Sequence, residues 1–284
     1  IGNPNVGKST LMNALVGEKL SIITSKAQTT RHRIMGIVSG EDFQIVYSDT
    51  PGILKPSYKL QESMMKFVTG ALTDADVILY VTGTVEQSER SAEIVDSIRR
   101  SGIPTVVVIN KIDLSTPEAL EALVDKWQAE IPGAQVVPTS AKENFNIEGL
   151  FRTILSLLPE GPAFYPKDTL TDKTLRFFAS EIIREKILKF YDKEIPYCCE
   201  IEIESYKEEP TIDRIAATIY VARDSQKGIL IGHKGEKLKR VGQTAREDME
   251  QFLDKKVFLQ LFVKVSDDWR NNERQLRRFG YEQE

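Results

Sequence analysis

Near the start of the chain, glycines precede a lysine and two hydroxyl residues at a spacing suited to binding phosphate. The pattern G-x-x-x-x-G-K-[ST] and one further hydroxyl are supplied by Gly2, Asn3, Pro4, Asn5, Val6, Gly7, Lys8, Ser9 and Thr10. Glycines let successive backbone N–H groups curl round a phosphate, which then lies at the positive end of the helix that follows. We expect Lys8 to stabilise charge on two neighbouring phosphates and the Ser9 hydroxyl to bind Mg²⁺. The stretch therefore predicts a site for the phosphates of a nucleotide.

A carboxylate and a glycine follow the predicted strand 43–48, where they can meet the same phosphates. The four residues are Asp49, Thr50, Pro51 and Gly52. We expect Asp49 to hold Mg²⁺ through a water molecule and the Gly52 N–H to act in catalysis beside the terminal phosphate. A D-x-x-G pattern is common by itself, so its weight comes from following the phosphate loop and ending a strand.

The ends of two further predicted strands carry residues that can recognise a base. Asn110, Lys111 and Asp113 close the strand 105–110, and Ser140, Ala141 and Lys142 follow the strand 135–138. Asp113 can accept hydrogen bonds from both N1–H and the exocyclic amine of guanine, whereas adenine offers a lone pair at N1 and no such amine. The second group can supply a backbone N–H to the guanine carbonyl. These residues predict that the site binds GTP and GDP.

A basic loop in the second half of the chain suggests a different ligand. From Lys227 to Arg246 the only acid is Glu236, and the bases are Lys227, Lys234, Lys237, Lys239, Arg240 and Arg246. A strand-like aliphatic run that ends at Ile231 leads into Gly232, His233, Lys234 and Gly235, and a basic helix follows. This arrangement resembles the type II KH module, whose G-x-x-G loop clamps a single-stranded RNA backbone. The resemblance implies that Lys234, Lys237, Lys239 and Arg240 neutralise phosphates, with His233 in the clamp and Ile231 lining the base groove. The plain alternative is a solvated basic helix.

The elements that would position the nucleotide residues alternate between strands and helices. This order predicts an α/β P-loop domain over residues 1–158, with a mixed, mostly parallel sheet and flanking helices. An antiparallel hairpin is expected from 34–39 and 43–48, further strands at 77–82, 105–110 and 135–138, and helices at 9–18, 88–100, 116–129 and 147–158. Because a phosphate loop normally follows a strand and the chain begins at Ile1, we expect the first strand to be missing from the sequence.

The pattern changes after residue 158. Residues 159–174 concentrate Pro and Gly and are predicted to be a linker. Residues 175–284 are predicted to form an α+β domain in the order α-β-β-α-β. Its helices are expected at 175–191 and 237–253, and its strands at 197–206, 212–223 and 257–265.

The composition sets outer limits on these interpretations. The 284 residues are 41% hydrophobic and 28% charged, which is typical of a globular chain and excludes collagen-like and disordered classes. The net charge of −4 does not by itself predict a nucleic-acid partner. No apolar run approaches the roughly 18 residues of a membrane span, and the neighbouring cysteines Cys198 and Cys199 cannot form a spaced disulfide framework. We expect a cytoplasmic protein.

Taken in order, the nucleotide motifs resemble those of the translation-factor-related small GTPases. Gln28, Thr29, Thr30, Arg31 and His32 lie where such proteins keep their first switch. The resemblance makes Thr30, or else Thr29, the second Mg²⁺ hydroxyl. It also includes relatives in which the asparagine at the position of Asn5 helps to hold K⁺, which makes K⁺ a candidate second cofactor.

The residue after Gly52 predicts a slow enzyme. It is Ile53, where Ras has a glutamine that orients the attacking water. An aliphatic side chain cannot polarise water. We therefore expect slow unaided in-line hydrolysis of GTP, with Mg²⁺, Lys8 and the switch threonine stabilising charge and another group or partner positioning the water.

The whole chain resembles the Era family of bacterial ribosome-assembly GTPases. Besides the motifs above, the likeness extends to Arg33, to residues 179–186 and to Leu276, Gly280 and Tyr281. It implies binding near the single-stranded 3′ end of 16S ribosomal RNA during assembly of the small (30S) subunit, with GTP favouring the RNA-competent state. It also implies a monomer with possible peripheral contact at the inner membrane.

Two other classes of function fit part of the sequence. The first is an RNA-binding adaptor whose nucleotide site is only structural, which GTP turnover abolished by Lys8→Ala would exclude. The second is a tRNA-modification or tandem-domain GTPase. The single phosphate loop and the KH-like tail oppose this second class, and failure to bind single-stranded RNA would favour it.

Overall fold

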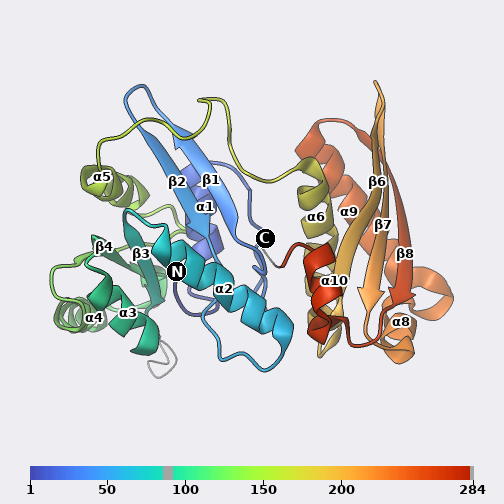
Figure 1. Cartoon of the computed structure of the whole chain (residues 1–284), viewed down its shortest axis with the longest axis horizontal. Coiled ribbons are helices and arrows are strands. Elements are labelled where there is room, and N and C mark those ends of the chain that lie inside the picture. The colour runs from blue at the N-terminus through green and yellow to red at the C-terminus, as the bar shows by residue number, and fades with distance from the viewer. Residues whose placement is uncertain (86–91, 282–284) are drawn as a thin grey trace. The chain divides into compact units, whose positions relative to one another are not determined.

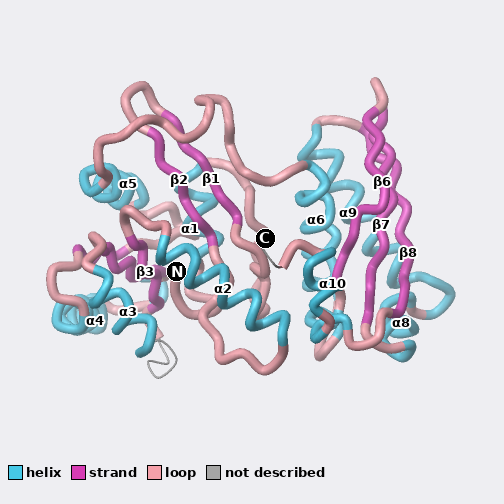
Figure 2. Tube along the Cα trace, in the orientation of Figure 1, coloured by secondary structure: helices cyan, strands magenta, loops and turns pink. Residues whose placement is uncertain are grey.

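The computed structural model describes residues 1–85 and 92–281. The chain folds into two compact units (Figure 1). The first unit comprises Ile1–Ser57 and Met64–Asp172, and the second comprises Tyr58–Ser63 and Lys173–Glu284. The expected architecture, an α/β P-loop domain followed by an α+β KH domain, is confirmed, and Figure 2 shows the mixture of helices and strands in each part. Among the described residues, no helix is both long and apolar enough to span a membrane.

The strands of the first unit form two sheets. The hairpin of β1 (Ile34–Ser39) and β2 (Gln44–Asp49) is antiparallel, and β3 (Ile78–Gly83), β4 (Thr105–Asn110) and β5 (Gln135–Pro138) are parallel in that order. All six residues of β4 are buried, as expected for a central parallel strand covered on both faces. Both nucleotide motifs that end a parallel strand therefore lie at the same edge of this sheet.

Within the described residues, these strands therefore form two separate sheets instead of the one mixed sheet that we predicted. A hollow of about 660 Å³, lined by parts of β2, β3 and α1 (Lys8–Val16), separates the two sheets. Ile1 lies beside β3, because its nitrogen donates to Leu79 O at 2.9 Å and its oxygen accepts from Val81 N at 2.8 Å. A strand before the phosphate loop stays a prediction.

Helices cover these sheets. They are α1, α2 (Lys59–Thr73), α3 (Ala92–Ser101), α4 (Pro117–Glu130) and α5 (Ile147–Leu157). The first residues of the predicted helix 88–100, up to residue 91, lie outside the described part of the chain. Helix α4 begins where the sequence suggests, because Thr116 caps the Ala119 N–H and Pro117 occupies the first turn. Its Trp127 packs on Tyr80 of β3, with ring centroids 5.2 Å apart, inside the core.

The predicted linker is irregular but attached to the hairpin. Ile37 N donates to Leu170 O at 2.8 Å, and Gly36 forms a bridge with Thr171. The Gln44 side chain bonds to the backbone of Phe164 and Tyr165. The segment therefore covers the outer edge of β1, which would otherwise present unpaired backbone groups.

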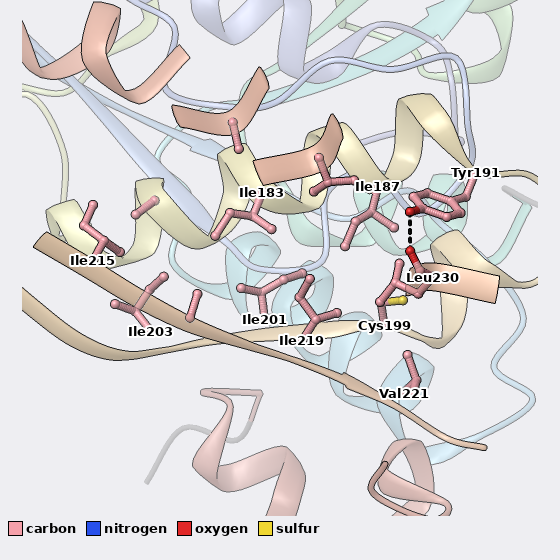
Figure 3. Close-up of a cluster of buried hydrophobic side chains, with 14 of the residues drawn as sticks. Ile183, Ile187, Tyr191, Cys199, Ile201, Ile203, Ile215, Ile219, Val221 and Leu230 are labelled. Atoms are coloured by element: carbon pink, nitrogen blue, oxygen red, sulfur yellow. Dashed lines mark hydrogen bonds between the residues drawn. The ribbon is translucent and has the colours of Figure 1, made fainter. Parts of the chain in front are cut away.

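The second unit contains one three-stranded sheet. Its elements are α6 (Leu175–Phe190), α7 (Ile195–Cys198), β6 (Glu200–Glu208), β7 (Ile212–Val221), α8 (Asp224–Ile231), α9 (Glu236–Leu253), β8 (Lys256–Val265) and α10 (Glu273–Arg278). The strand order is β6-β7-β8, antiparallel in the first pair and parallel in the second. Isoleucines of α6, β6 and β7 interdigitate in its core (Figure 3).

Two expectations for the second unit were wrong in detail. The aliphatic run that ends at Ile231 is the last turn of α8 rather than a strand, and the predicted strand 197–206 begins only at Glu200, after the short helix α7. Both errors have one cause, because an apolar run of about four residues has no period that separates strand from helix. The structure therefore presents the Gly232–Gly235 loop between two helices.

Candidate functional site

The phosphate loop is shaped around Lys8. Its ammonium group donates to Gly2 O at 3.0 Å and to Asn3 O at 2.9 Å, which closes the loop over the side chain. Burial lowers the pKa of Lys8 to about 8. Gly7 has φ +94°, and a Cβ there would lie 2.3 Å from Asn110 Nδ2, so glycine is required by both conformation and space. The loop is thus fixed at its start and at the entry to α1.

Two hydroxyls meet across the site. Ser9 Oγ lies 2.8 Å from Thr30 Oγ1, and Thr30 is only 8% exposed. Thr29 points elsewhere, because its hydroxyl lies 2.6 Å from Thr24 Oγ1 and donates to Lys26 O at 2.7 Å. Of the two threonines that the sequence left open, Thr30 is the one beside the phosphate loop.

Asp49 supplies a third oxygen group. Its Oδ2 accepts from Ser21 Oγ at 2.9 Å, while Oδ1 is buried and has no hydrogen-bond partner within the described residues. Burial raises the pKa of Asp49, although the hydroxyls of Ser9 and Ser21 and the charge of Lys8 oppose the rise. A buried carboxylate oxygen without a donor, near the hydroxyls of Ser9 and Ser21, is suited to a hard divalent cation.

Sequence reasoning missed Ser21. It is 1% exposed and is oriented by the Asn13 side chain, which accepts from Ser21 N at 3.0 Å. No motif singles it out, because its partner Asp49 is 28 positions away.

A small pocket joins the predicted catalytic residues. Its volume is about 70 Å³, and its lining includes Asn5, Lys8, Thr30 and Gly52. The next residue, Ile53, donates its N–H to Gly2 O at 3.1 Å, while its side chain is 5% exposed and lies in the core. Ile53 therefore offers no polar group to a water in the pocket, because its side chain is apolar and its N–H is bonded to Gly2.

The base-recognition residues are tied to the phosphate loop. Asn110 Nδ2 donates to Val6 O at 2.9 Å, and Lys111 Nζ donates to Asn5 O at 2.5 Å. Asn110 Oδ1 also accepts from Ala141 N at 2.9 Å. The Ala141 N–H, one of the backbone groups of residues 140–142 that could donate to guanine, is therefore bonded to Asn110 in the structure.

Asp113 is an exposed residue whose side chain is held by Ser140. Ser140 Oγ donates to Asp113 Oδ1 at 2.6 Å. Lys142 is paired with Glu143 at 2.9 Å and is 78% exposed. The bond that Lys142 donates to the Glu143 carboxylate raises the pKa of Lys142. Asn110, Asp113 and Ser140 thus form one connected group, with Lys142 at its outer side.

The second predicted site lies between α8 and α9. The side chains of His233, Lys234, Lys237, Lys239 and Arg240 are exposed, and Ile231 is half-buried. Gly235 is the N-cap of α9 and has no side chain to occupy the first N–H groups of the helix. Exposed cations beside a helix N-terminus give this loop the features of a phosphate-binding site.

Together these features define a P-loop GTPase domain joined to a KH domain. Residues 1–111 match the family described as 50S ribosome-binding GTPase, and residues 194–270 match the KH domain family. The curated "GTPase Era" of Staphylococcus haemolyticus is 44% identical over 283 residues, covering 99% of this chain and 95% of the relative. The "GTPase Era" of Alkaliphilus metalliredigens is also 44% identical, covering 99% and 97%. The chain belongs to the Era family of GTPases.

Solved structures agree with this assignment. Era in complex with MgGDPNP and nucleotides 1506–1542 of 16S ribosomal RNA matches with a TM-score of 0.95 and 40% identity, covering 99% of this chain and 97% of that chain. An Era variant from Aquifex aeolicus bound to GDP and AlF4⁻ matches with the same score, identity and coverage. The predicted GTPase activity and the predicted RNA-binding class are therefore confirmed at the level of the family.

Proposed function

We propose that this GTPase binds the single-stranded 3′ end of 16S ribosomal RNA during assembly of the 30S subunit, with its nucleotide state controlling RNA binding. One observation carries the proposal: the chain superimposes over 99% of its length, at a TM-score of 0.95, on an Era that holds both MgGDPNP and this RNA. The exposed basic loop at the start of α9 supports it, because its cations can neutralise the phosphates of a nucleic-acid backbone.

The donors around the phosphate loop fit Mg²⁺. Ser9, Thr30 and Asp49 offer hard oxygen atoms, and Asp49 Oδ1 is buried without a donor among the described residues. We assign Ser9 and Thr30 as direct ligands and Asp49 as a ligand through water. The ion would neutralise charge on the β- and γ-phosphates when bound.

Lys8 and Gly52 complete the charge stabilisation. Lys8 Nζ would exchange the carbonyls of Gly2 and Asn3 for phosphate oxygens, and the Gly52 N–H would donate to the γ-phosphate as water attacks in line. Because the apolar side chain of Ile53 is buried in the core, the chain offers no polar group at that position to orient the water. We therefore expect slow turnover until a partner or a rearranged switch supplies one.

The proposal has four finer parts. Asn5 borders the phosphate pocket, which is compatible with a K⁺ ion there, and equal turnover in sodium and potassium would count against that role. Contact with the 30S subunit, peripheral membrane contact and a monomeric state stay predictions.

RNA affinity measured in each nucleotide state tests the proposal. The probe is a labelled single-stranded RNA that matches the 3′ end of 16S ribosomal RNA, compared with an unrelated RNA of equal length. We expect tighter binding of the matched RNA with GDPNP than with GDP, and by linkage tighter GDPNP binding when RNA is present. Equal affinity in both nucleotide states would contradict the proposed control.

A further inference from the structure

We infer that Phe190 and Tyr191, at the C-terminal end of α6, are positioning residues for the phosphate-binding cations of the α8–α9 loop. The inference rests on the proposed RNA-binding function and assigns a role to side chains about 40 residues upstream of the loop in the sequence. Three contacts within the second unit carry it.

The first contact fixes the backbone that enters the loop. The buried hydroxyl of Tyr191 donates to Leu230 O at 2.6 Å (Figure 3). Leu230 is two residues before Gly232 and is itself fully buried. Helix α6 therefore anchors the last turn of α8, from which the loop departs.

The second contact restrains Lys237 from two sides. Its ammonium nitrogen lies 5.8 Å from the centroid of the Tyr191 ring. Its aliphatic stem passes over Gly232, where an added Cβ would lie 2.7 Å from Lys237 Cγ. Gly232 also has φ +74°, so the first glycine of the loop is required by conformation and by the path of this lysine.

The third contact restrains Arg240. Its guanidinium carbon lies 4.1 Å from the centroid of the Phe190 ring, a stacking distance. A free arginine loses much rotamer freedom when it binds a phosphate, and an arginine already held on an aromatic face loses less. The ring thus favours RNA binding without contacting RNA.

A double-mutant cycle tests this role. If Phe190 acts through Arg240, Phe190→Leu weakens RNA binding about three- to tenfold in the unaltered protein and has no further effect in an Arg240→Gln background. Tyr191→Phe, which keeps the ring and removes the hydroxyl, is expected to weaken binding similarly through the loop backbone. Phe252→Leu is the matched control, because Phe252 is a half-exposed aromatic at the other end of α9.

The readouts separate positioning from simple instability. Because Phe190 packs against the core of the second unit, Phe190→Leu is expected to lower the melting temperature slightly but to stay folded at the temperature of the binding assay. Its RNA-free GTP turnover should match that of the unaltered protein, and the slope of log affinity against log salt should stay constant because the cations remain. Additive losses in the cycle, or a control variant that weakens binding equally, would overturn the inference. Equal binding of the matched and unrelated RNAs by the unaltered protein would contradict the 16S proposal instead, and the cycle can still be read on either RNA.

Discussion

The hydroxyl of Ser9 lies 2.8 Å from that of Thr30, although the two residues are 21 positions apart. The contact joins the phosphate loop to the segment that corresponds to the first switch. A cation bound by both oxygens would hold the switch in place, and loss of the γ-phosphate would weaken that hold. We therefore expect the pair to be the point at which the nucleotide state changes the conformation of the first switch.

Substitution of the two neighbouring threonines should separate their roles. Thr30→Ala is expected to raise the Mg²⁺ concentration needed for GTP turnover at least about tenfold, because it would remove one of the proposed ligand oxygens. Thr29→Ala is the matched control, since its hydroxyl bonds to Thr24 and Lys26 within the same segment. Turnover measured across a Mg²⁺ titration gives the answer, and equal effects of both changes would contradict the assignment.

Asp49→Asn should stabilise the protein without metal while abolishing its response to metal. Burial raises the pKa of Asp49, so the cost of its charge is fully present above the folded-state pKa and is absent below the unfolded-state pKa. At neutral pH without Mg²⁺ we expect the free energy of unfolding of the asparagine variant to equal that of the unaltered protein or to exceed it by on the order of 1 kcal/mol. Thermal unfolding with GDP, with and without Mg²⁺, checks both effects. A variant that Mg²⁺ stabilises as much as the unaltered protein would rule out Asp49 as a ligand.

Nucleotide affinity should fall as pH rises above about 8. The pKa of Lys8 is lowered to about 8 by burial, and phosphate binding favours its charged form. Above that pH the free protein must take up a proton on binding, so affinity drops by up to about tenfold per pH unit. Titrations with GDP between about pH 7 and about pH 9 measure the slope, with Lys8→Arg as the permanently charged comparison. A flat profile in the unaltered protein would show that Lys8 stays charged.

Guanine selectivity should depend on Asp113 and, less strongly, on Ser140. Asp113→Ala would remove the two bonds expected to guanine, of about 1.5–3 kcal/mol each, so GTP affinity should fall at least about a hundredfold while ATP affinity, which we expect to be low, changes little. Ser140→Ala removes only the hydroxyl that holds Asp113 at 2.6 Å, and we expect a smaller loss. Competition between the two nucleotides distinguishes this from general damage, which would lower both affinities.

The parts of the site that could be predicted from the sequence are those formed by residues adjacent in the chain. The phosphate loop, the Asp49–Gly52 segment and the Asn110–Asp113 segment are each read from a few adjacent residues at the ends of strands. The fold class followed from the same alternation of strands and helices. The α8 helix was missed because its aliphatic residues have no distinguishing period over so short a run.

Contacts between distant residues could not be predicted in this way. Ser21 is an ordinary serine until the fold brings it to 2.9 Å from Asp49. The stacking of Arg240 on Phe190 likewise depends on how α6 packs beside α9. Such pairs have no sequence signature, because the side chains that meet belong to separate elements.

GTP turnover with and without RNA tests the central claim most directly. The RNA matches the 3′ end of 16S ribosomal RNA. Three proteins are compared: the unaltered chain, the Gly232→Asp variant, and Lys8→Ala as the inactive reference. Gly232→Asp places a carboxylate and a strained residue in the Gly232–Gly235 loop. We predict that RNA stimulates the unaltered protein, and that Gly232→Asp keeps the basal rate but loses the stimulation. Turnover of the unaltered protein that is indifferent to RNA would contradict coupling between the two domains.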